Sequence, residues 1–177
     1  MSVINASGGI NYWVVNLPGP SLWPLETNSA VITQLTGSNA IKLVRAYDDT
    51  TEEFGNGSII LPPNFYTGGT IYFKAYVSAA TAAASKNIGL TFGHRPISDS
   101  ESWDQTYTDV DSGAIAIDAT QDDVTLAEWS VANSTAGWAV NDMVDFRFAR
   151  DPTVTDDLTG DMYWHTGCIL IPLIGTF

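Results

Sequence analysis

The sequence predicts an all-β domain: an antiparallel β-sandwich of jelly-roll-like order, with about ten strands and an irregular N-terminal arm. Apolar and polar residues alternate with a period of two along much of the chain, which is typical of half-buried strands. Clusters of Gly, Pro and Asn interrupt these segments at short intervals, as they do in sandwiches and barrels. Helical periodicity is scarce, and the one helix-prone stretch, 78–85, is expected to be a loop or a single turn because it has no charged face and no large apolar residue. A closed up-and-down barrel is the main alternative.

The first 30 residues form the predicted arm, and residues 31–177 form the predicted sandwich domain. Three prolines, Pro18, Pro20 and Pro24, exclude a long central strand in the arm, although 10–16 has strand character. The arm is nevertheless apolar, so it either covers the bottom of its own sandwich or docks on a neighbouring subunit. In the second case the residues that bind the partner are Trp13, Leu17, Leu22, Trp23 and Leu25.

Nine further strands are expected after the arm, at 30–35, 40–47, 57–61, 71–78, 87–94, 114–118, 124–132, 144–149 and 162–171. In 71–78, apolar residues alternate with Tyr72, Lys74 and Tyr76, which gives one buried and one wetter face. The segment 144–149 alternates in the same way, with Asp145 and Arg147 on its wetter face. Each of these two strands therefore has one side in the core and one side toward water.

The last strand, 162–171, is apolar on both sides. Strict alternation places Trp164 and Cys168 on one face and His165 and Ile169 on the other, so we expect this strand to be covered on both faces. The chain stays apolar to residue 177, where an exposed end would normally be polar. This end is expected to be buried in its own sheet or at a subunit contact.

Composition and charge exclude several classes of protein. With 45% hydrophobic and 15% charged residues, the chain is neither a disordered acidic tail nor a coiled coil. Its net charge of −13 disfavours nucleic-acid binding and predicts a uniformly acidic outer surface. No apolar run is long enough to span a membrane, and the first ten residues lack the features of a secretory signal peptide. We expect no nucleic-acid or membrane partner, and assembly in a cytoplasm.

The sequence contains no recognisable catalytic constellation. Cys168 is the single cysteine and is interpreted as a small core residue. His94 and His165 are far apart in the sequence and each lacks a neighbouring Cys or second His, which disfavours a metal site. The acidic loops could supply oxygen ligands to calcium, but none has the EF-hand spacing, and solvated loops explain them more simply. We therefore expect no enzymatic activity, no cofactor and no metal.

The six tryptophans give one alternative function, the binding of a glycan. Trp129, Trp138 and Trp164 lie in or beside predicted strands, where packing in the core is the common use of tryptophan. Trp103 instead lies in a polar segment, with Tyr107 close by in the sequence. These two residues, Trp103 and Tyr107, form the glycan-binding site in this alternative.

The most distinctive string lies in the C-terminal third of the chain. A turn at Trp138 leads to a strand that ends in Arg150-Asp151, and an Asp-rich loop then closes in Leu158-Thr-Gly-Asp161 before the final strand. With the strand 69–77, this pattern resembles small virion proteins of tailed bacteriophages over about residues 69–171. The nearest group is the jelly-roll head decoration proteins, also called cement proteins. Arg150 is expected to hold the loop at Asp156-Asp157 by a bidentate contact, which is a role in folding.

The resemblance implies a non-enzymatic virion structural protein, most simply a capsid decoration protein that stabilises the head by bridging capsid subunits. It implies two partners, further copies of the chain in a homotrimer and the major capsid protein. It also implies a location on the capsid surface after assembly in the cytoplasm of a bacterial host. A tail or fibre component, or a carbohydrate-binding (receptor-binding) module, is the alternative.

Overall fold

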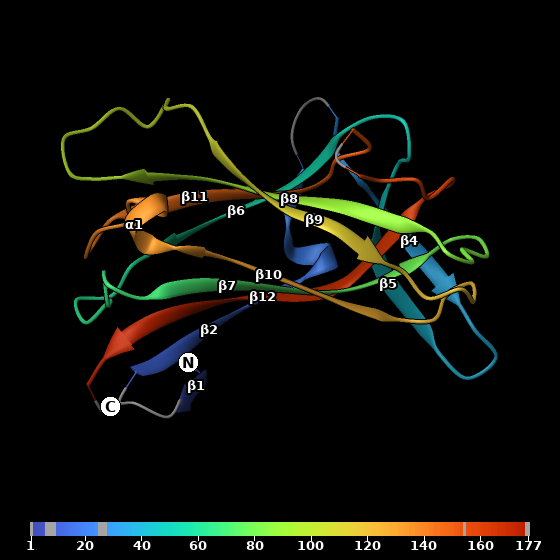
Figure 1. The fold of residues 1–177 in the computed structure, drawn as a ribbon, viewed down its shortest axis with the longest axis horizontal. Helices are drawn as coiled ribbons and strands as arrows, with labels where there is room; N and C mark the ends of the chain where they lie inside the picture. Colours follow the sequence, from blue (N-terminus) through green and yellow to red (C-terminus); the bar gives the residue numbers. More distant parts are fainter. Residues whose placement is uncertain (1, 6–9, 25–27, 154, 176–177) are drawn as a thin grey trace.

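The computed structural model describes residues 2–5, 10–24, 28–153 and 155–175, which form two antiparallel sheets packed face to face (Figure 1). The larger sheet contains β1 (Ser2–Asn5), β2 (Ile10–Pro18), β4 (Val31–Thr36), β5 (Ile41–Tyr47), β7 (Thr70–Ala79), β10 (Thr125–Ala132) and β12 (Met162–Ile174). The smaller sheet contains β3 (Trp23–Pro24), β6 (Glu53–Ile60), β8 (Asn87–Ile97), β9 (Thr108–Ala116) and β11 (Met143–Arg150). Two single-turn helices, η1 (Gly19–Ser21) and α1 (Asn133–Ala136), complete the described elements.

The strands follow jelly-roll order, as the sequence predicts. In the larger sheet, β12 lies between β7 on one side and β2 and β5 on the other, while β10 pairs with β7 and β4 pairs with β5. The smaller sheet has the order β3-β6-β11-β8-β9. Strands β5 to β8 alternate between the sheets, and so do β9 to β12, which is the double Greek key of a jelly roll. Both sheets have open edges, so the alternative of a closed barrel is excluded.

All ten predicted strands are present, and β1 and β3 are short additions to them. The predicted strand 57–61 starts earlier, at Glu53, and the predicted strand 114–118 is observed as Thr108–Ala116. The helix-prone stretch 78–85 forms no helix, because β7 continues to Ala79 and turns follow. The sequence did not predict α1, which ends at Gly137 in the left-handed conformation (φ 71°). Neither described helix is long and apolar enough to cross a membrane.

Aromatic side chains from both sheets fill the core. The ring of Phe73 on β7 stacks on Phe92 of β8 with centroids 3.9 Å apart, and Phe148 on β11 lies 4.9 Å from Trp164 on β12. Trp129, Trp138 and Trp164 are all buried, as their positions in the sequence predict. The apolar end of the chain is buried in its own sheet as far as Leu173, and residues 176–177 lie outside the described residues.

Strand β12 departs from strict alternation at a β-bulge. Its pairing with β7 shifts register between Trp164 and Thr166, so Trp164 before the bulge and Ile169 after it both face the core. The prediction that Trp164 and Cys168 share a face is wrong, because a bulge inserts one residue and reverses the alternation. Cys168 is half-buried on the outer face of the sheet and is not a core residue. Gly167 makes room for the displaced ring, since a Cβ there would lie 2.4 Å from Cζ2 of Trp164.

The N-terminal arm covers its own sandwich. Strand β2 pairs along its whole length with β12, and Leu17 and Leu22 are buried in the core. The buried guanidinium of Arg45 holds the segment after β2 in place by donating to the carbonyls of Gly19 (3.1 Å), Leu22 and Ala30 (2.5 Å). Among the described residues no carboxylate lies within ion-pair distance of Arg45, so backbone carbonyls are the direct hydrogen-bond partners of its charge. The prediction that the prolines exclude a long central strand in the arm is wrong: β2 has nine residues and lies between β1 and β12, because the first proline, Pro18, comes only at its end.

Arg150 holds the loop between β11 and β12, which confirms the sequence prediction. Its side chain is fully buried, and Nε and Nη2 donate to the two carboxylate oxygens of Asp156 at 2.8 and 3.0 Å. Its remaining N–H groups donate to the carbonyls of Leu158 (2.5 Å) and Gly160 (2.7 Å). The string that carries the resemblance to phage virion proteins therefore contains a structural ion pair.

Candidate binding face on the larger sheet

The outer face of the larger sheet carries a group of tyrosines and small polar residues, which we call the tyrosine face. Strand alternation turns three side chains of β7 outward, Tyr72, Lys74 and Tyr76, and the bulge in β12 turns Thr166 and Cys168 to the same side. Cross-strand pairing with β10 and β2 brings their outward residues alongside. The tyrosine face consists of Tyr12, Asn16, Tyr72, Lys74, Tyr76, Glu128, Ser130, Thr166 and Cys168.

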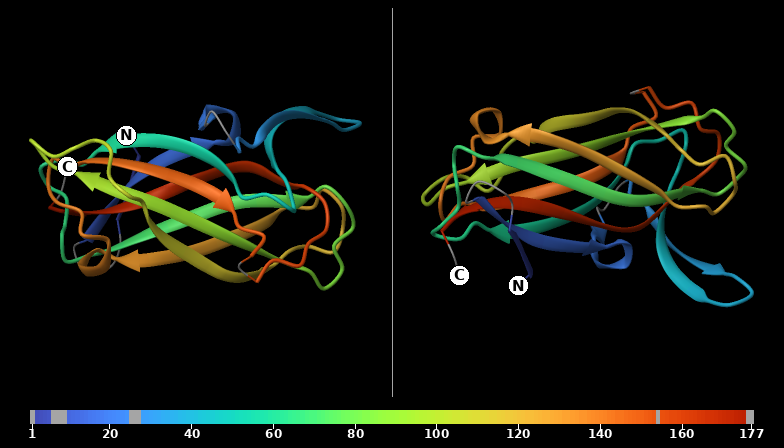
Figure 2. Two further views of the ribbon diagram at one scale, coloured as in Figure 1. Left: turned by 90° about the horizontal axis from the view of Figure 1, so that it is seen from above. Right: turned by 60° about the horizontal axis from the view of Figure 1, so that its bottom comes forward.

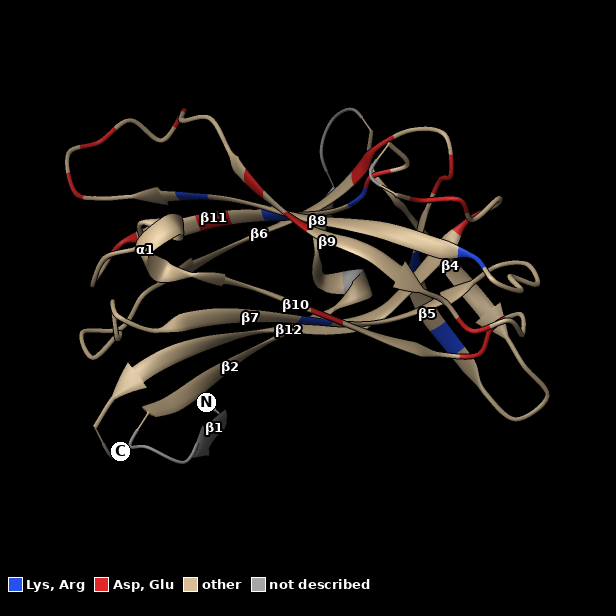
Figure 3. Cartoon of the chain, viewed as in Figure 1, with Lys and Arg blue, Asp and Glu red and all other residues tan. Residues whose placement is uncertain are grey.

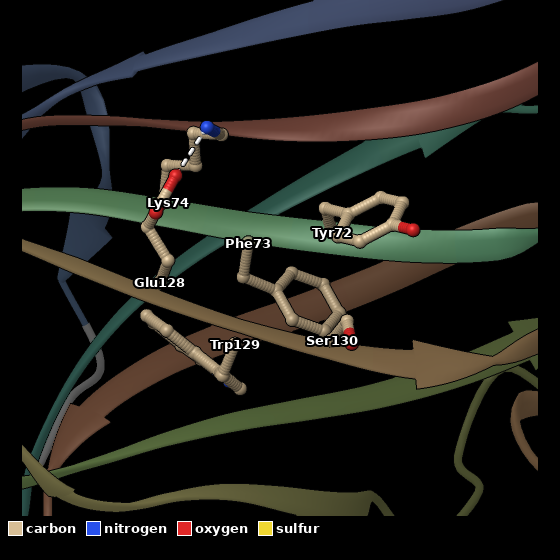
Figure 4. A pocket seen from close by; sticks show the side chains of 6 residues that line it. All are labelled: Tyr72, Phe73, Lys74, Glu128, Trp129 and Ser130. Atoms are coloured by element: carbon tan, nitrogen blue, oxygen red, sulfur yellow. Dashed lines mark hydrogen bonds and ion pairs between the residues drawn. The ribbon is translucent and has the colours of Figure 1, made fainter.

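Two hollows lie on this face, and Lys74 lines both of them. The first measures about 370 Å³ and is lined by Tyr72, Phe73, Lys74, Glu128, Trp129 and Ser130 (Figure 4). Since the side chains of Phe73 and Trp129 point into the core, the backbone of β7 and β10 forms its floor. The second measures about 120 Å³ and is lined by Asn16, Lys74, Tyr76, Thr166, Gly167 and Cys168.

The tyrosine rings are partly free to contact a ligand. Tyr72 and Tyr76 are 40% and 45% exposed, and Tyr12 lies edge-on to Tyr72 with ring centroids 5.6 Å apart. Burial, and then the neighbouring Tyr72, raises the pKa of the Tyr12 hydroxyl above its usual range, so this hydroxyl keeps its proton near neutral pH. It can therefore both donate and accept a hydrogen bond.

The ionisable groups of the tyrosine face other than the tyrosines are either paired or neutral. Lys74 forms an ion pair with Glu128 across the β7–β10 ladder, and the hydrogen bond to that carboxylate raises the pKa of Lys74. Burial raises the pKa of the Cys168 thiol, so its thiolate, the nucleophilic form, is scarce at neutral pH. The face offers apolar rings and neutral hydrogen-bonding groups, with one compensated ion pair in the middle.

The acidic residues are distributed unevenly, in contrast to the uniformly acidic surface expected from the sequence. The seven strands of the larger sheet contain one acidic residue, Glu128, and three basic ones, Lys42, Arg45 and Lys74. The other 18 of the 19 acidic residues in the described ranges lie in the smaller sheet and in segments between strands (Figure 3). The larger sheet is thus the part of the molecule with the least negative charge.

The outer surface of the smaller sheet differs, because it carries two ion pairs. Arg95 binds Asp145 (3.1 Å) and Arg147 binds Asp109 (3.0 Å). Gly93 allows the second pair to lie flat on the strands, because a Cβ there would be 2.5 Å from Oδ1 of Asp109. The polar groups on this surface are largely paired with one another.

Trp103 and Tyr107, the two residues predicted to bind a glycan, lie in different environments. Trp103 is 70% exposed on the loop between β8 and β9, as the sequence predicts. Tyr107 is half-buried, and the guanidinium carbons of Arg95 and Arg147 lie 4.5 and 4.8 Å from its ring centroid. These cations compete with a sugar for the ring of Tyr107, whereas Trp103 stays accessible.

The residues of the arm also divide between two environments. Leu17 and Leu22 are buried and Trp13 packs against the core, so these three side chains stabilise the sandwich of their own chain. Trp23 is 64% exposed beside the smaller sheet, and Leu25 lies outside the described residues. Among the described members of the predicted partner-binding set, Trp23 is the most exposed to solvent.

Both histidines are buried, each in a different part of the sandwich. Nε2 of His165 lies 2.9 Å from the hydroxyl of the buried Ser78, but the other ring nitrogen has no hydrogen-bond partner among the described residues. His94 accepts a hydrogen bond from the indole of Trp138 at 3.1 Å. Burial lowers the pKa of each histidine to about 4, so both are neutral at pH 7. Within the described residues no three His, Cys, Asp or Glu side chains are grouped as metal ligands would be.

No protein-family model matches the chain, and a search of curated proteins found no match. Among solved structures, the chain is similar to the enzymatically active domain of tailspike protein 4 of bacteriophage CBA120, at 8% identity and a TM-score of 0.45, over 90% of this chain and 19% of that chain. It is also similar to the CBM22-1 xylan-binding domain from Paenibacillus barcinonensis Xyn10C, at 7% identity and a TM-score of 0.46, over 92% of this chain and 95% of that chain. A third similar structure is that of infectious bursal disease virus, Gt strain, at 10% identity and a TM-score of 0.42, over 93% of this chain and 32% of that chain. The chain spans about a fifth of the tailspike chain.

Proposed function

We propose that this chain is a non-enzymatic binding module of a virion and that it holds a neutral carbohydrate chain on the tyrosine face. One observation carries the proposal: two partly exposed tyrosines border two hollows on the same side of one sheet. Tyr72 and Tyr76 are four residues apart on β7, which corresponds to about 13 Å along a strand. A chain of sugar rings laid along β7 would contact both rings.

The chemistry of the face matches that of a sugar. A pyranose ring presents C–H groups on its faces and hydroxyl groups around its rim. The tyrosine rings supply flat apolar surface for the C–H groups, while the side chains of Asn16, Ser130 and Thr166 donate and accept hydrogen bonds at the rim. A mostly apolar site with a few polar groups that fix orientation is the usual composition of a small-molecule site.

The charge of the face favours a neutral polysaccharide over an anionic one. The ammonium of Lys74 already pairs with Glu128, so a carboxylate or phosphate of the ligand would have to compete with that carboxylate. The rest of the molecule is strongly acidic and repels a polyanion. A ligand with hydroxyl groups alone avoids both costs.

Affinity electrophoresis tests the proposal with soluble xylan, galactomannan and laminarin as neutral probes and polygalacturonate as the anionic probe. A glycan array that includes bacterial surface polysaccharides extends the search. We expect retardation by at least one neutral polysaccharide, and about fivefold or more weaker binding in Tyr72→Ala and Tyr76→Ala, since an aromatic contact contributes about 1 kcal/mol or more.

Trp103→Ala is the matched control, because it removes an exposed aromatic ring elsewhere on the molecule. If Trp103→Ala abolishes binding and the tyrosine variants do not, the site is on the β8–β9 loop and the proposed face is refuted. If no neutral glycan binds on the array or in the gel, the carbohydrate function itself is refuted.

Capsid decoration is the second candidate function. The resemblance of residues 138–164 to phage virion proteins supports it, and the exposed Trp23 provides an aromatic side chain of the kind that anchors protein interfaces. The test adds purified protein to undecorated phage heads and examines them by electron microscopy. Added density on the head surface supports decoration, whereas bare heads at saturating protein contradict it.

A further inference from the structure

A two-stranded hairpin projects from the body of the sandwich. It is formed by β4 and β5, which pair from Val31 opposite Ala46 to Thr36 opposite Ile41, and Gly37 donates to the carbonyl of Ala40 at its tip. Figure 2 shows the hairpin extending beyond the two sheets. Strand β5 joins the body only at its base, where Arg45 to Tyr47 pair with β12. A hollow of about 310 Å³ separates the tip from the loop at Gln121.

The projecting part is apolar on both of its faces. The most exposed apolar side chains are Val31, Ile32, Ile41 and Leu43, and each is about half exposed or more. Residues directly opposite one another in an antiparallel pair share a face, so Ile32, Leu43 and Ile41 lie on one face and Val31 lies on the other. Water-exposed apolar surface of this kind on a protruding element marks an interaction site.

The hairpin also ends in an unprotected sheet edge. β4 is the terminal strand of the larger sheet, and its outer edge pairs with none of the described strands. Natural edge strands are usually protected by proline, charge or a bulge, and the sequence Val-Ile-Thr-Gln-Leu-Thr of β4 has neither proline nor charge, while its pairing shows no register shift. Such an edge can add a strand from another chain through its free N–H and C=O groups.

Charge identifies the partner. Residues 28–47 contain no Asp or Glu, although the whole chain has a net charge of −13. Two copies of this chain repel each other over most of their surfaces but not at their hairpins, which carry Lys42 as the one solvent-exposed charge. We infer that the hairpin docks on the hairpin of a second copy, β4 against β4 in antiparallel fashion, and joins the two larger sheets into one.

This contact is isologous and closes at two copies. It differs from the homotrimer expected from the sequence, which requires a head-to-tail contact. It also uses a different segment of the chain, since the arm residues Leu17 and Leu22 are buried in their own core. The two tyrosine faces of such a dimer lie on one continuous sheet.

Sedimentation equilibrium of the full chain between 1 and 200 µM tests the inference, with the mass compared to the 19.1 kDa of one copy. We expect a reversible dimer whose dissociation constant rises at least tenfold in the double variant Val31→Lys/Ile32→Lys, which places charge on β4 itself. Ile60→Lys is the matched control, because Ile60 on the smaller sheet is 69% exposed and Val31 is 61% exposed. The control should leave the dissociation constant unchanged.

Gln34→Lys gives a second, independent readout. Gln34 is exposed near the middle of β4, and a lysine there places like charges close together across the two-fold axis. It should therefore weaken the dimer without altering the melting temperature of the dilute monomer. A monomer throughout the concentration range, a trimer, or a dimer that the hairpin variants do not weaken would each overturn the inference.

Discussion

Removal of the carboxylate of Asp156 is expected to destabilise the protein by about 3–5 kcal/mol, although this residue lies in a loop. The side chains of Arg150 and Asp156 are 0% and 2% exposed, and they share two hydrogen bonds. Asp156→Ala leaves two N–H groups of a buried guanidinium without acceptors and an uncompensated charge in the core. It also removes the carboxylate oxygen that accepts from the backbone N–H of Gly89 (3.2 Å) and one of the two acceptors of the backbone N–H of Leu158 (3.1 Å), which keeps the carbonyl of Asn87. Each buried donor left unpaired costs about 1–3 kcal/mol, and relaxation of the loop reduces the total.

Urea unfolding monitored by tryptophan fluorescence measures this free energy. The matched control is Glu128→Ala, which breaks the exposed ion pair with Lys74 and should cost about 0–1 kcal/mol. The double variant Arg150→Met/Asp156→Leu should recover much of the loss, since apolar residues can replace a buried pair. If Asp156→Ala lies within 1 kcal/mol of wild type, or if both ion pairs cost the same, the reasoning about burial is refuted.

Two further predictions concern the histidines and the arm. Because the pKa values of His94 and His165 are about 4 in the folded protein and about 6.5 when unfolded, their contribution to stability is complete above about pH 6.5 and is lost as the pH falls from there toward 4. Each histidine contributes up to about 1.4 kcal/mol per pH unit in that window, which corresponds to one proton taken up on unfolding. His94→Gln or His165→Gln should therefore reduce the slope of unfolding free energy against pH by up to that amount, and an unchanged slope would contradict the lowered pKa of the histidine. Leu22→Ala should lower the unfolding free energy by about 2–5 kcal/mol because Leu22 is buried, whereas Trp23→Ala should change it by about 0.5 kcal/mol or less. If Trp23 anchors a capsid partner, its truncation should instead cost about 2 kcal/mol of association, and lost stability with unchanged capsid affinity would refute the anchoring role.

Alternation was sufficient to predict the architecture and the facing of most strands. It placed Tyr72, Lys74 and Tyr76 on the wetter side of β7, where they now form the centre of the tyrosine face. It did not show that β10, β2 and β12 bring further polar groups beside them, because that depends on strand order, which a single sequence leaves open. The one feature of the sequence that indicated this site was the alternation of Tyr72, Lys74 and Tyr76 on the polar side of β7.

Alternation failed where a local irregularity changed its phase. No proline or turn sequence near Trp164 and Thr166 predicts the bulge between them. The bulge moves Cys168 from its expected place in the core to the outer face of the sheet. The exposed hairpin was missed for a related reason, since Ile41 and Leu43 have the pattern of a half-buried strand and only the tertiary structure shows that nothing covers them. Arg150, by contrast, was predictable because its carboxylate partner lies six residues away in the sequence.

The uneven distribution of charge gives the molecule an electric dipole, with its less negative end at the larger sheet. Near a negatively charged surface, the protein as a whole is repelled, yet the torque on this dipole turns the larger sheet toward that surface before contact. The tyrosine face and the hairpin therefore arrive first, and the acidic loops stay directed toward the solvent. Because a Debye length at physiological salt is about 8 Å, this orientation acts only over the last few ångströms of approach, and added salt should speed the encounter by screening the net repulsion, without changing which face binds.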